Sequence, residues 1–201
     1  MGISRFNFTR VSGGSFSNIC FITGGFGLSD IYEELSREQL IALLNDYSKN
    51  WLALDGLWFQ AVEKRWGMDL AMECDIEMWE QFTVIEARRI KKFLGLPEQG
   101  GLDGLEKALK LRFYGNLNKD EYIREGNTLK YRMLECRVQS ARERKGMEFH
   151  PCKRVGIPEY GLFAKAIDDR ISCECISCYP DITETDCHCS WLFTLEEIAE
   201  E

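Results

Sequence analysis

Long apolar runs and an excess of positive charge are both missing from this sequence. No stretch reaches the roughly 18 apolar residues that a membrane-spanning helix needs. The 201 residues carry 25 Lys and Arg against 33 Asp and Glu, which gives a net charge of −8. Because neutralisation of phosphates drives nucleic-acid binding, an acidic chain argues against such a partner. We expect neither a membrane nor a nucleic acid as partner, and we interpret the basic runs at 88–92 and 142–145 as solvated faces.

Histidine is also scarce, with two residues in the chain. A cysteine nucleophile needs a base beside it, and Cys136 has no histidine close to it in the sequence, so its pattern is a poor match to a nucleophile. His150 and His188 each flank cysteines, which favours a role in or around a metal site.

A secretory signal is not evident either. Asn18, Thr23 and three glycines interrupt the N-terminal stretch "FSNICFITGGFGL", and no small-residue cleavage site follows it. We therefore expect a cytoplasmic location. In a reducing compartment, clustered cysteines more often bind metal or perform redox chemistry than form structural disulfides.

The chain divides into three segments by pattern. Residues 1–35 carry no clear period and predict an irregular or flexible leader. Residues 36–116 predict a helical lobe with helices at 36–66, 69–94 and 102–113, the first opened by a capping box of Ser36 and Gln39. Residues 117–201 predict an α+β part that forms one compact domain with the lobe, with strands at 121–138 around a turn at 125–127, a helix at 156–168, and strands at 171–179 and 187–195.

These elements predict an α+β fold, in which a helical N-terminal half packs on a small antiparallel sheet with a cysteine-rich C-terminal hairpin. Within the second strand, apolar residues occupy odd positions up to Met133 and even positions from Leu134. Such a change of phase predicts a bulge or a sharp twist near Met133.

Five of the nine cysteines lie between Cys173 and Cys189. Cys175 and Cys178 form a C-x-x-C pair that can converge on one ion, and Cys189 lies on the returning arm of the hairpin. The fourth donor must come from outside the hairpin, and the candidates are Cys152, Cys136 and His150. We rank first the set Cys152, Cys175, Cys178 and Cys189.

Zinc and an iron–sulfur cluster both suit four thiolates, and we expect Zn²⁺ first. A second geometry remains open, since Cys173 shares a strand face with Cys175, and Cys187 shares one with Cys189. Two other interpretations also remain, namely buried free thiols and disulfides.

Acidic residues interrupt the apolar faces of the first two helices. Asp55 shares a face with three tryptophans of the first helix, Glu63 lies beside them, and Glu86 interrupts an apolar stripe of the second helix. Such acids are either paired, with Arg137 as a natural partner, or raised in pKa and available as general acids or bases in a pocket. Arg137 could alternatively hold a ligand carboxylate in a bidentate fashion.

The motifs "GLWFQAVEKRWGMDLAMECDIEMWEQF", "RMLECRVQSARERKG" and "HPCKRVGIPEYGLFAKAIDDRISCECISCYPD" followed by "CHCSWLFTLEE" resemble a family of uncharacterised bacterial and archaeal cytosolic proteins. Members are described as similar to L-2-amino-thiazoline-4-carboxylic acid hydrolase. The C-terminal part is also similar to the 4-vinyl reductase domain. That second resemblance implies an α+β small-molecule-binding module whose metal site would use Glu174, Cys175 or Cys178, and Cys189.

Three functions follow as hypotheses. The first is a metal-containing hydrolase of a small heterocyclic or amide-like acid, in which Arg137 holds the substrate carboxylate and Glu86 or Asp55 moves protons. The second is a non-enzymatic sensor or carrier, with a structural metal and with the tryptophans of the first helix lining the pocket. The third is an iron–sulfur or thiol redox protein. All but the last need a small-molecule ligand or substrate, and the oligomeric state is open.

Overall fold

The computed structural model describes residues 30–196, so most of the predicted leader lies outside the described residues. The chain divides into two compact units, Met1–Leu40 and Ile41–Glu201. The described part of the first unit contains the short helix α1 (Asp30–Glu33) and the beginning of α2. Ser36 Oγ accepts a hydrogen bond from the Gln39 N–H at 3.2 Å, and Gln39 Oε1 accepts one from the Ser36 N–H at 2.8 Å. The predicted capping box is confirmed.

The helices of the second unit follow the predicted periodicity closely. Gly67 (φ 86°) separates α2 from α3, and Gly95 (φ 63°) ends α3 in the left-handed conformation that glycine adopts most easily. Four helices have bounds close to the predicted ones: α2 (Arg37–Trp66), α3 (Met68–Leu94), α4 (Gly101–Lys110) and α6 (Lys153–Ile167). A further helix, α5 (Arg137–Arg144), was not predicted. No helix of the described range is long and apolar enough to cross a membrane.

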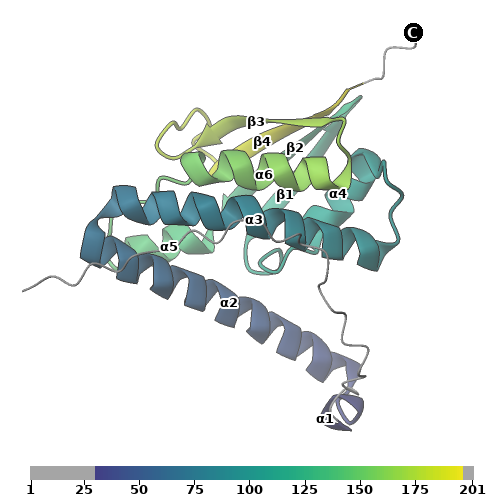
Figure 1. The fold of residues 1–201 in the computed structure, drawn as a ribbon, viewed down its shortest axis with the longest axis horizontal. Coiled ribbons are helices and arrows are strands. Elements are labelled where there is room, and N and C mark those ends of the chain that lie inside the picture. The colour runs from purple at the N-terminus through teal and green to yellow at the C-terminus, as the bar shows by residue number, and fades with distance from the viewer. Residues whose placement is uncertain (1–29, 197–201) are drawn as a thin grey trace, which may run out of the picture. The chain divides into compact units, whose positions relative to one another are not determined.

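The strands form one antiparallel sheet in the order β1-β2-β4-β3. They are β1 (Lys119–Glu125), β2 (Thr128–Glu135), β3 (Ile171–Cys178) and β4 (Cys189–Leu195). A tight turn at Gly126 (φ 55°) joins β1 to β2, and β3 returns as β4 to complete the cysteine-rich hairpin (Figure 1). The fold is therefore α+β, as the sequence predicts.

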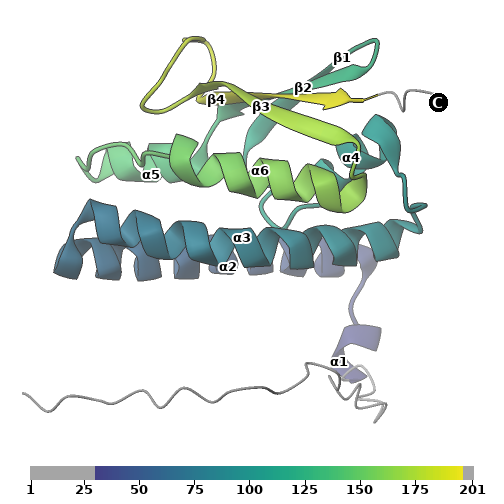
Figure 2. The same cartoon turned by 45° about the horizontal axis from the view of Figure 1, so that its top comes forward.

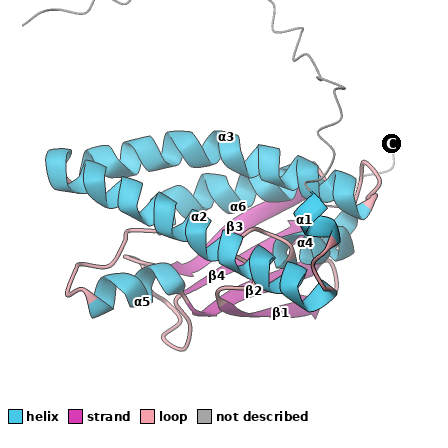
Figure 3. Ribbon diagram, turned by 90° about the horizontal axis from the view of Figure 1, so that it is seen from below, coloured by secondary structure: helices cyan, strands magenta, loops and turns pink. Residues whose placement is uncertain are grey.

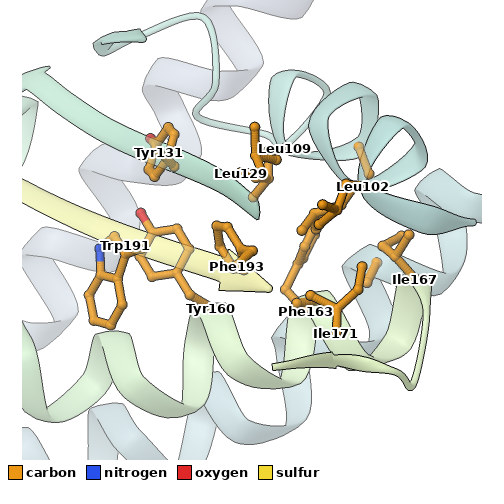
Figure 4. Close-up of a cluster of buried hydrophobic side chains, with 14 of the residues drawn as sticks. Leu102, Leu109, Leu129, Tyr131, Tyr160, Phe163, Ile167, Ile171, Trp191 and Phe193 are labelled. Carbon is orange, nitrogen blue, oxygen red and sulfur yellow. The ribbon is translucent and has the colours of Figure 1, made fainter. Parts of the chain in front are cut away.

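The second unit is layered. Helix α6 packs directly on one face of the sheet, and α3 and α2 lie beyond it, on the side away from the strands (Figure 2). The core between α4, α6 and the sheet is apolar, with Phe163, Phe193 and Ile167 fully buried (Figure 4). Burial of these large side chains, at about 25 cal/mol per Å² of apolar surface, is the main source of stability for this layer.

Two bulges change which face the strand residues present. Lys119 pairs with Glu135 and Asp120 with Met133, which leaves Leu134 as the extra residue of β2. This irregularity lies where the change of apolar phase predicts one. In β3, Cys175 pairs with Trp191 and Ser177 with Ser190, so Ile176 is extra there too.

One prediction about this region is wrong. The second strand was expected to continue to Val138, but β2 ends at Glu135 and α5 begins at Arg137. A helix puts residues three to four apart on one side, so Gln139 and Arg142 become buried together while Arg144 stays exposed. The run 142–145 is therefore not simply a solvated basic face.

Candidate functional site

A cavity of about 450 Å³ lies between α2 on one side and the sheet, α5 and α6 on the other. Figure 3 shows α2 and α3 diverging from a common end on the helical side of the sheet, with α5 on the side of that end. α2 contributes Leu52, Asp55, Gly56 and Phe59 to the lining, α3 contributes Asp75 and Trp79, and α5 and α6 contribute Ala141, Val155 and Glu159. The floor is formed by Met133, Cys178, Cys189 and Trp191 of the sheet. Such a volume and mixed lining fit a small-molecule pocket.

Trp191 is held in the floor by a glycine of α6. A Cβ at Gly156 would lie 2.5 Å from Cζ2 of the Trp191 indole, so only glycine allows this approach. Trp191 is 1% exposed and stacks on Tyr160 with ring centroids 4.7 Å apart. Its Nε1–H is buried and has no hydrogen-bond partner among the described residues. An unpaired buried donor is costly, and a ligand acceptor would satisfy it.

Asp55 is the acid of α2 that lines the cavity. Burial, helped by the negative charges of Asp75 and Glu159 and opposed by His150, raises the pKa of this carboxyl to about 6. The group therefore changes charge near neutral pH, as the sequence analysis anticipates for an acid on an apolar face. It can donate or accept a proton to or from a bound molecule.

A row of polar side chains runs from Asp75 through His150 to Cys152. His150 Nε2 lies 3.5 Å from Asp75 Oδ2, and His150 Nδ1 lies 3.2 Å from Cys152 Sγ. Gln139 fixes the backbone of His150 at both sides, since its amide accepts from the His150 N–H at 3.0 Å and donates to the His150 carbonyl at 2.8 Å. Phe59 packs on the imidazole with ring centroids 4.6 Å apart.

Glu86 belongs to a buried ion-pair network instead of the cavity lining. Arg112 Nε lies 3.0 Å from Glu86 Oε2, and Glu86 Oε1 accepts the Phe113 N–H at 2.8 Å. The other end of the guanidinium pairs with Glu159, which also accepts a hydrogen bond from the Tyr114 hydroxyl. Burial raises the pKa of Glu159, and the nearby Arg112 charge opposes this shift. Both Glu86 oxygens are already bonded, so the residue is well placed as a structural anchor.

Arg137 lines the cavity, and its backbone N–H donates to Asn118 Oδ1 at 2.9 Å. It forms no ion pair with Asp55, Glu63 or Glu86. The partner of Glu63 is Arg142, whose two terminal nitrogens lie 2.9 and 2.8 Å from the two carboxylate oxygens. The expectation that Arg137 pairs with an acid of the helices is wrong, because α5 turns Arg142 inward instead.

Three of the predicted metal ligands, Cys152, Cys178 and Cys189, line the cavity, and the fourth, Cys175, forms a hydrogen bond with Cys178. Cys178 is directly opposite Cys189 in the sheet and interacts with both Cys175 and Cys189 through its thiol, while Cys152 lies close enough to act on it electrostatically. The bulge at Ile176 puts Cys175 and Cys178 on the same face, towards α6. These interactions connect Cys152, Cys175, Cys178 and Cys189 from three separate segments, but among the described residues no three of their sulfur atoms all lie within 4.8 Å of one another.

The thiols of this group, which we call the cysteine cluster, differ in acidity. The hydrogen bond from Cys178 lowers the pKa of Cys175, and the same contact raises the pKa of Cys178. Burial raises the pKa of Cys152 well above its usual range. Cys175 therefore ionises more easily than Cys152 or Cys178.

Cys136, Cys173 and Cys187 are close to the cysteine cluster in the sequence or the sheet but are not among the predicted ligands ranked first. Cys173 shares the helix-facing side of β3 with Cys175, as predicted, and burial raises its pKa to about 12. Burial raises the pKa of Cys136 to about 11, which does not suit a nucleophile. Cys187 contacts Glu184 and the charge of Arg132, which belong to the outer face of the sheet. The prediction that Cys187 and Cys189 share one face of a strand is wrong, because β4 begins only at Cys189.

Among the described residues, the group of three possible metal ligands whose ligand atoms all lie within 4.8 Å of one another is Glu184, Asp186 and Cys187. Arg132 forms ion pairs with both acids, and Lys130 forms another with Glu184. Protein cations therefore already neutralise this group, and it is a poor cation site.

The aromatic residues of the cavity differ from the predicted ones. Trp51, Trp58 and Trp66 of α2 are 54%, 72% and 62% exposed and do not line it. The aromatic lining comes from Phe59, Trp79, Phe113, Tyr114, Tyr160 and Trp191. Trp191 is part of the quoted cysteine-rich stretch, but its role depends on α6 lying across the strand, and no local sequence signal gives that.

Comparisons with known proteins give a family and one partial likeness in fold. No curated protein matches the chain. The crystal structure of the phenol-responsive sensory domain of the transcription activator PoxR with phenol aligns with a TM-score of 0.47 and 15% identity, over 70% of this chain and 72% of that one. A likeness at this level carries no argument about a ligand. The model of a family of unknown function, DUF6125, matches residues 33–195, and the chain therefore belongs to that family.

Proposed function

We propose that the protein binds a compact, largely apolar molecule in the cavity, as a sensor or carrier, and that the cysteine cluster holds a structural metal beneath it. The observation that carries the proposal is a cavity of about 450 Å³ with a largely apolar lining, and Trp191, whose buried Nε1–H is unpaired, belongs to that lining. A pocket of this kind typically combines apolar walls with a few polar groups that orient the ligand.

The polar groups set the chemistry of the ligand. Trp191 supplies a donor, and Asp55, with a pKa raised by burial to about 6, supplies a donor or an acceptor depending on pH. The rings of Phe59, Trp79 and Tyr114 line the same cavity. A planar molecule with a hydroxyl, carbonyl or ring nitrogen at one edge would satisfy both groups.

Zinc fits the cysteine cluster by the chemistry of its donors. Cys152, Cys175, Cys178 and Cys189 are all free thiols, and thiolates are the ligands that zinc and iron–sulfur clusters prefer. Four protein ligands would leave no open position on zinc, so the ion would join α6 to the β3–β4 hairpin without taking part in chemistry. Free thiols of this kind also suit a reducing compartment such as the cytoplasm.

Ligand binding is tested by titrating 1-naphthol and naphthalene into the protein and measuring heat. We expect both to bind, and Trp191→Phe to weaken 1-naphthol by up to about tenfold while leaving naphthalene nearly unchanged, because a single neutral hydrogen bond contributes about 0.5–1.5 kcal/mol. Trp66→Phe, at an exposed position of α2, is the control. Absence of binding by both compounds and by other aromatic molecules of this size would remove the proposal.

A second candidate function is hydrolysis of a small cyclic or amide-like acid. The row of Asp75, His150 and Cys152 favours it, because His150 can accept the thiol proton while Asp75 orients the ring. Arg137 would hold the substrate carboxylate, and Asp55 would move a proton. In this alternative His150 must remove the Cys152 proton against the burial that raises the pKa of this thiol, and Cys152 cannot also be a permanent zinc ligand.

Cys152 separates the two functions. Reaction with iodoacetamide, followed by mass spectrometry, should leave Cys152 unmodified in protein that contains zinc. Rapid alkylation of Cys152 that depends on His150, together with turnover of thiazoline or amide acids, would favour the hydrolase.

A further inference from the structure

The outer side of α3 carries an exposed apolar stripe that the cavity does not use. Met78 and Ile85 are 38% and 45% exposed, and they flank a shallow hollow with Cys74, Gln81 and Phe82. These positions recur at intervals of three and four residues, so they form one continuous strip along the helix. Isolated exposed apolar residues are ordinary, but a contiguous strip marks an interaction surface.

The stripe continues onto α2. Trp51 stacks against Phe82 with ring centroids 6.3 Å apart, and Trp51 itself is 54% exposed. Leu54 and Trp58 follow on the same side of α2 at helical spacing and are 61% and 72% exposed. The tryptophans that the sequence places near the cavity are therefore part of this outer surface. Tryptophan is enriched at the centres of protein interfaces.

The charges beside the stripe on α3 are separated by sign. Glu73 and Glu77 lie in the N-terminal half of the helix, and Arg88 and Lys92 lie in the C-terminal half. All four side chains are exposed, and none forms an ion pair within the described residues. The two residues of each pair are four positions apart, so each pair makes one local patch of charge.

We propose that this surface is the interface of a homodimer, in which α3 of one copy packs antiparallel on α3 of a second copy. A two-fold axis near the middle of the helix would place Glu77 opposite Arg88, and Glu73 opposite Lys92, on both sides of the axis. A two-fold interface must be complementary to itself, and a helix with one acidic half and one basic half meets that condition only in the antiparallel arrangement. The apolar stripe and Trp51 are buried at the centre.

The charge pattern can be tested by reversing the charges in one half of α3 at a time. Glu73→Arg/Glu77→Arg makes both halves of α3 basic, and Arg88→Glu/Lys92→Glu makes both halves acidic. Each variant alone should be monomeric, with a dimer Kd raised at least about a hundredfold, since like charges opposed across an interface cost several kcal/mol. Mixed in equal amounts, the two variants should form a one-to-one heterodimer, because every opposed pair is again of opposite sign.

Sedimentation equilibrium of the full chain measures the molecular mass of the native protein, of each variant alone and of the mixture. Circular dichroism checks that the variants are folded. Lys107→Glu/Lys165→Glu reverses two exposed basic residues of α4 and α6, and this control should remain dimeric. A monomeric native chain over a wide range of concentration overturns the proposal. So do folded variants that both remain dimeric, or a mixture that stays monomeric.

Discussion

Arg142 and Glu63 form a two-pronged ion pair that connects α5 to α2 beside the cavity, with nitrogen–oxygen distances of 2.8 and 2.9 Å. The Arg142 side chain is 5% exposed and that of Glu63 is 19% exposed. This pair is one of the contacts that hold α2 against the rest of the unit, since α2 buries only Phe59 and Val62 fully.

Removal of the arginine should therefore loosen α2. We expect Arg142→Met to lower the free energy of unfolding by about 2–4 kcal/mol, and the double variant Glu63→Gln/Arg142→Met to recover part of that loss, because no unpaired charge remains. Urea unfolding of the two single variants and the double variant gives the coupling energy. Additive single effects would contradict this account.

The same pair predicts a dependence on pH. The hydrogen bond from Arg142 lowers the pKa of Glu63 below its value in the unfolded chain, against the effect of burial. The stabilisation is thus fully present above the unfolded pKa of 4.5 and is lost as the pH falls through the lower folded value. Glu63→Gln should flatten the acid side of the stability profile, whereas Asp46→Asn, at an exposed site of α2, should not.

Asp55 predicts the opposite trend. Its folded pKa of about 6 lies above the usual 3.8, chiefly because of burial, so its unfavourable contribution grows as the pH rises from 3.8 to 6 and is constant above that. Asp55→Asn should stabilise the ligand-free protein by about 1–2 kcal/mol at pH 7 and should have almost no effect at pH 4. Thermal unfolding at both values measures the difference, and an equal effect at the two pH values would refute the assignment.

Cysteine variants should distinguish ligands from neighbours. Cys175→Ser should lower the zinc content of protein prepared without air to a small fraction, whereas Cys173→Ser should leave it near one ion per chain. Both residues lie on the helix-facing side of β3. Only Cys175 has its pKa lowered by a hydrogen bond from Cys178. Elemental analysis distinguishes zinc from iron, and equal metal loss in the two variants would argue against the proposed set.

The contact between Gly156 and Trp191 predicts a change in the floor of the cavity. Gly156→Ala would place a Cβ 2.5 Å from the indole, so the ring must move, and we expect a loss of about 1–3 kcal/mol in stability and weaker ligand binding. Gly161→Ala on the same helix has open space around its Cβ and should be neutral or slightly stabilising. Tryptophan fluorescence with and without 1-naphthol reports the effect.

Local pattern was sufficient for the parts of the fold that depend on near neighbours. The capping box at Ser36, the breaks at Gly67 and Gly95, and the change of phase at Met133 each involve residues a few positions apart. The boundary at Arg137 was not predictable in the same way. Its apolar spacing fits a short strand as well as a helix, and the burial of Gln139 and Arg142 decides between them.

Long-range contacts account for most of what the sequence analysis did not find. Nothing near Glu86 indicates that Arg112 is its partner, and nothing near His150 indicates Asp75. The tryptophans of α2 also depend on contacts that the local sequence does not reveal. Helical periodicity groups Trp51 with Trp58 on one face, but it does not say whether that face is directed at a cavity or at solvent.

The extra residue at Ile176 has a consequence for how the C-x-x-C motif is counted. On a regular strand, two side chains three positions apart emerge on opposite surfaces, and here one inserted residue restores them to a common side. Deletion of Ile176 would shorten the motif to C-x-C, yet both sulfurs would still project the same way. The sulfur-to-sulfur relationship thus follows from the pleat and not from the number of intervening residues, so a search for equivalent centres in other chains should accept either spacing.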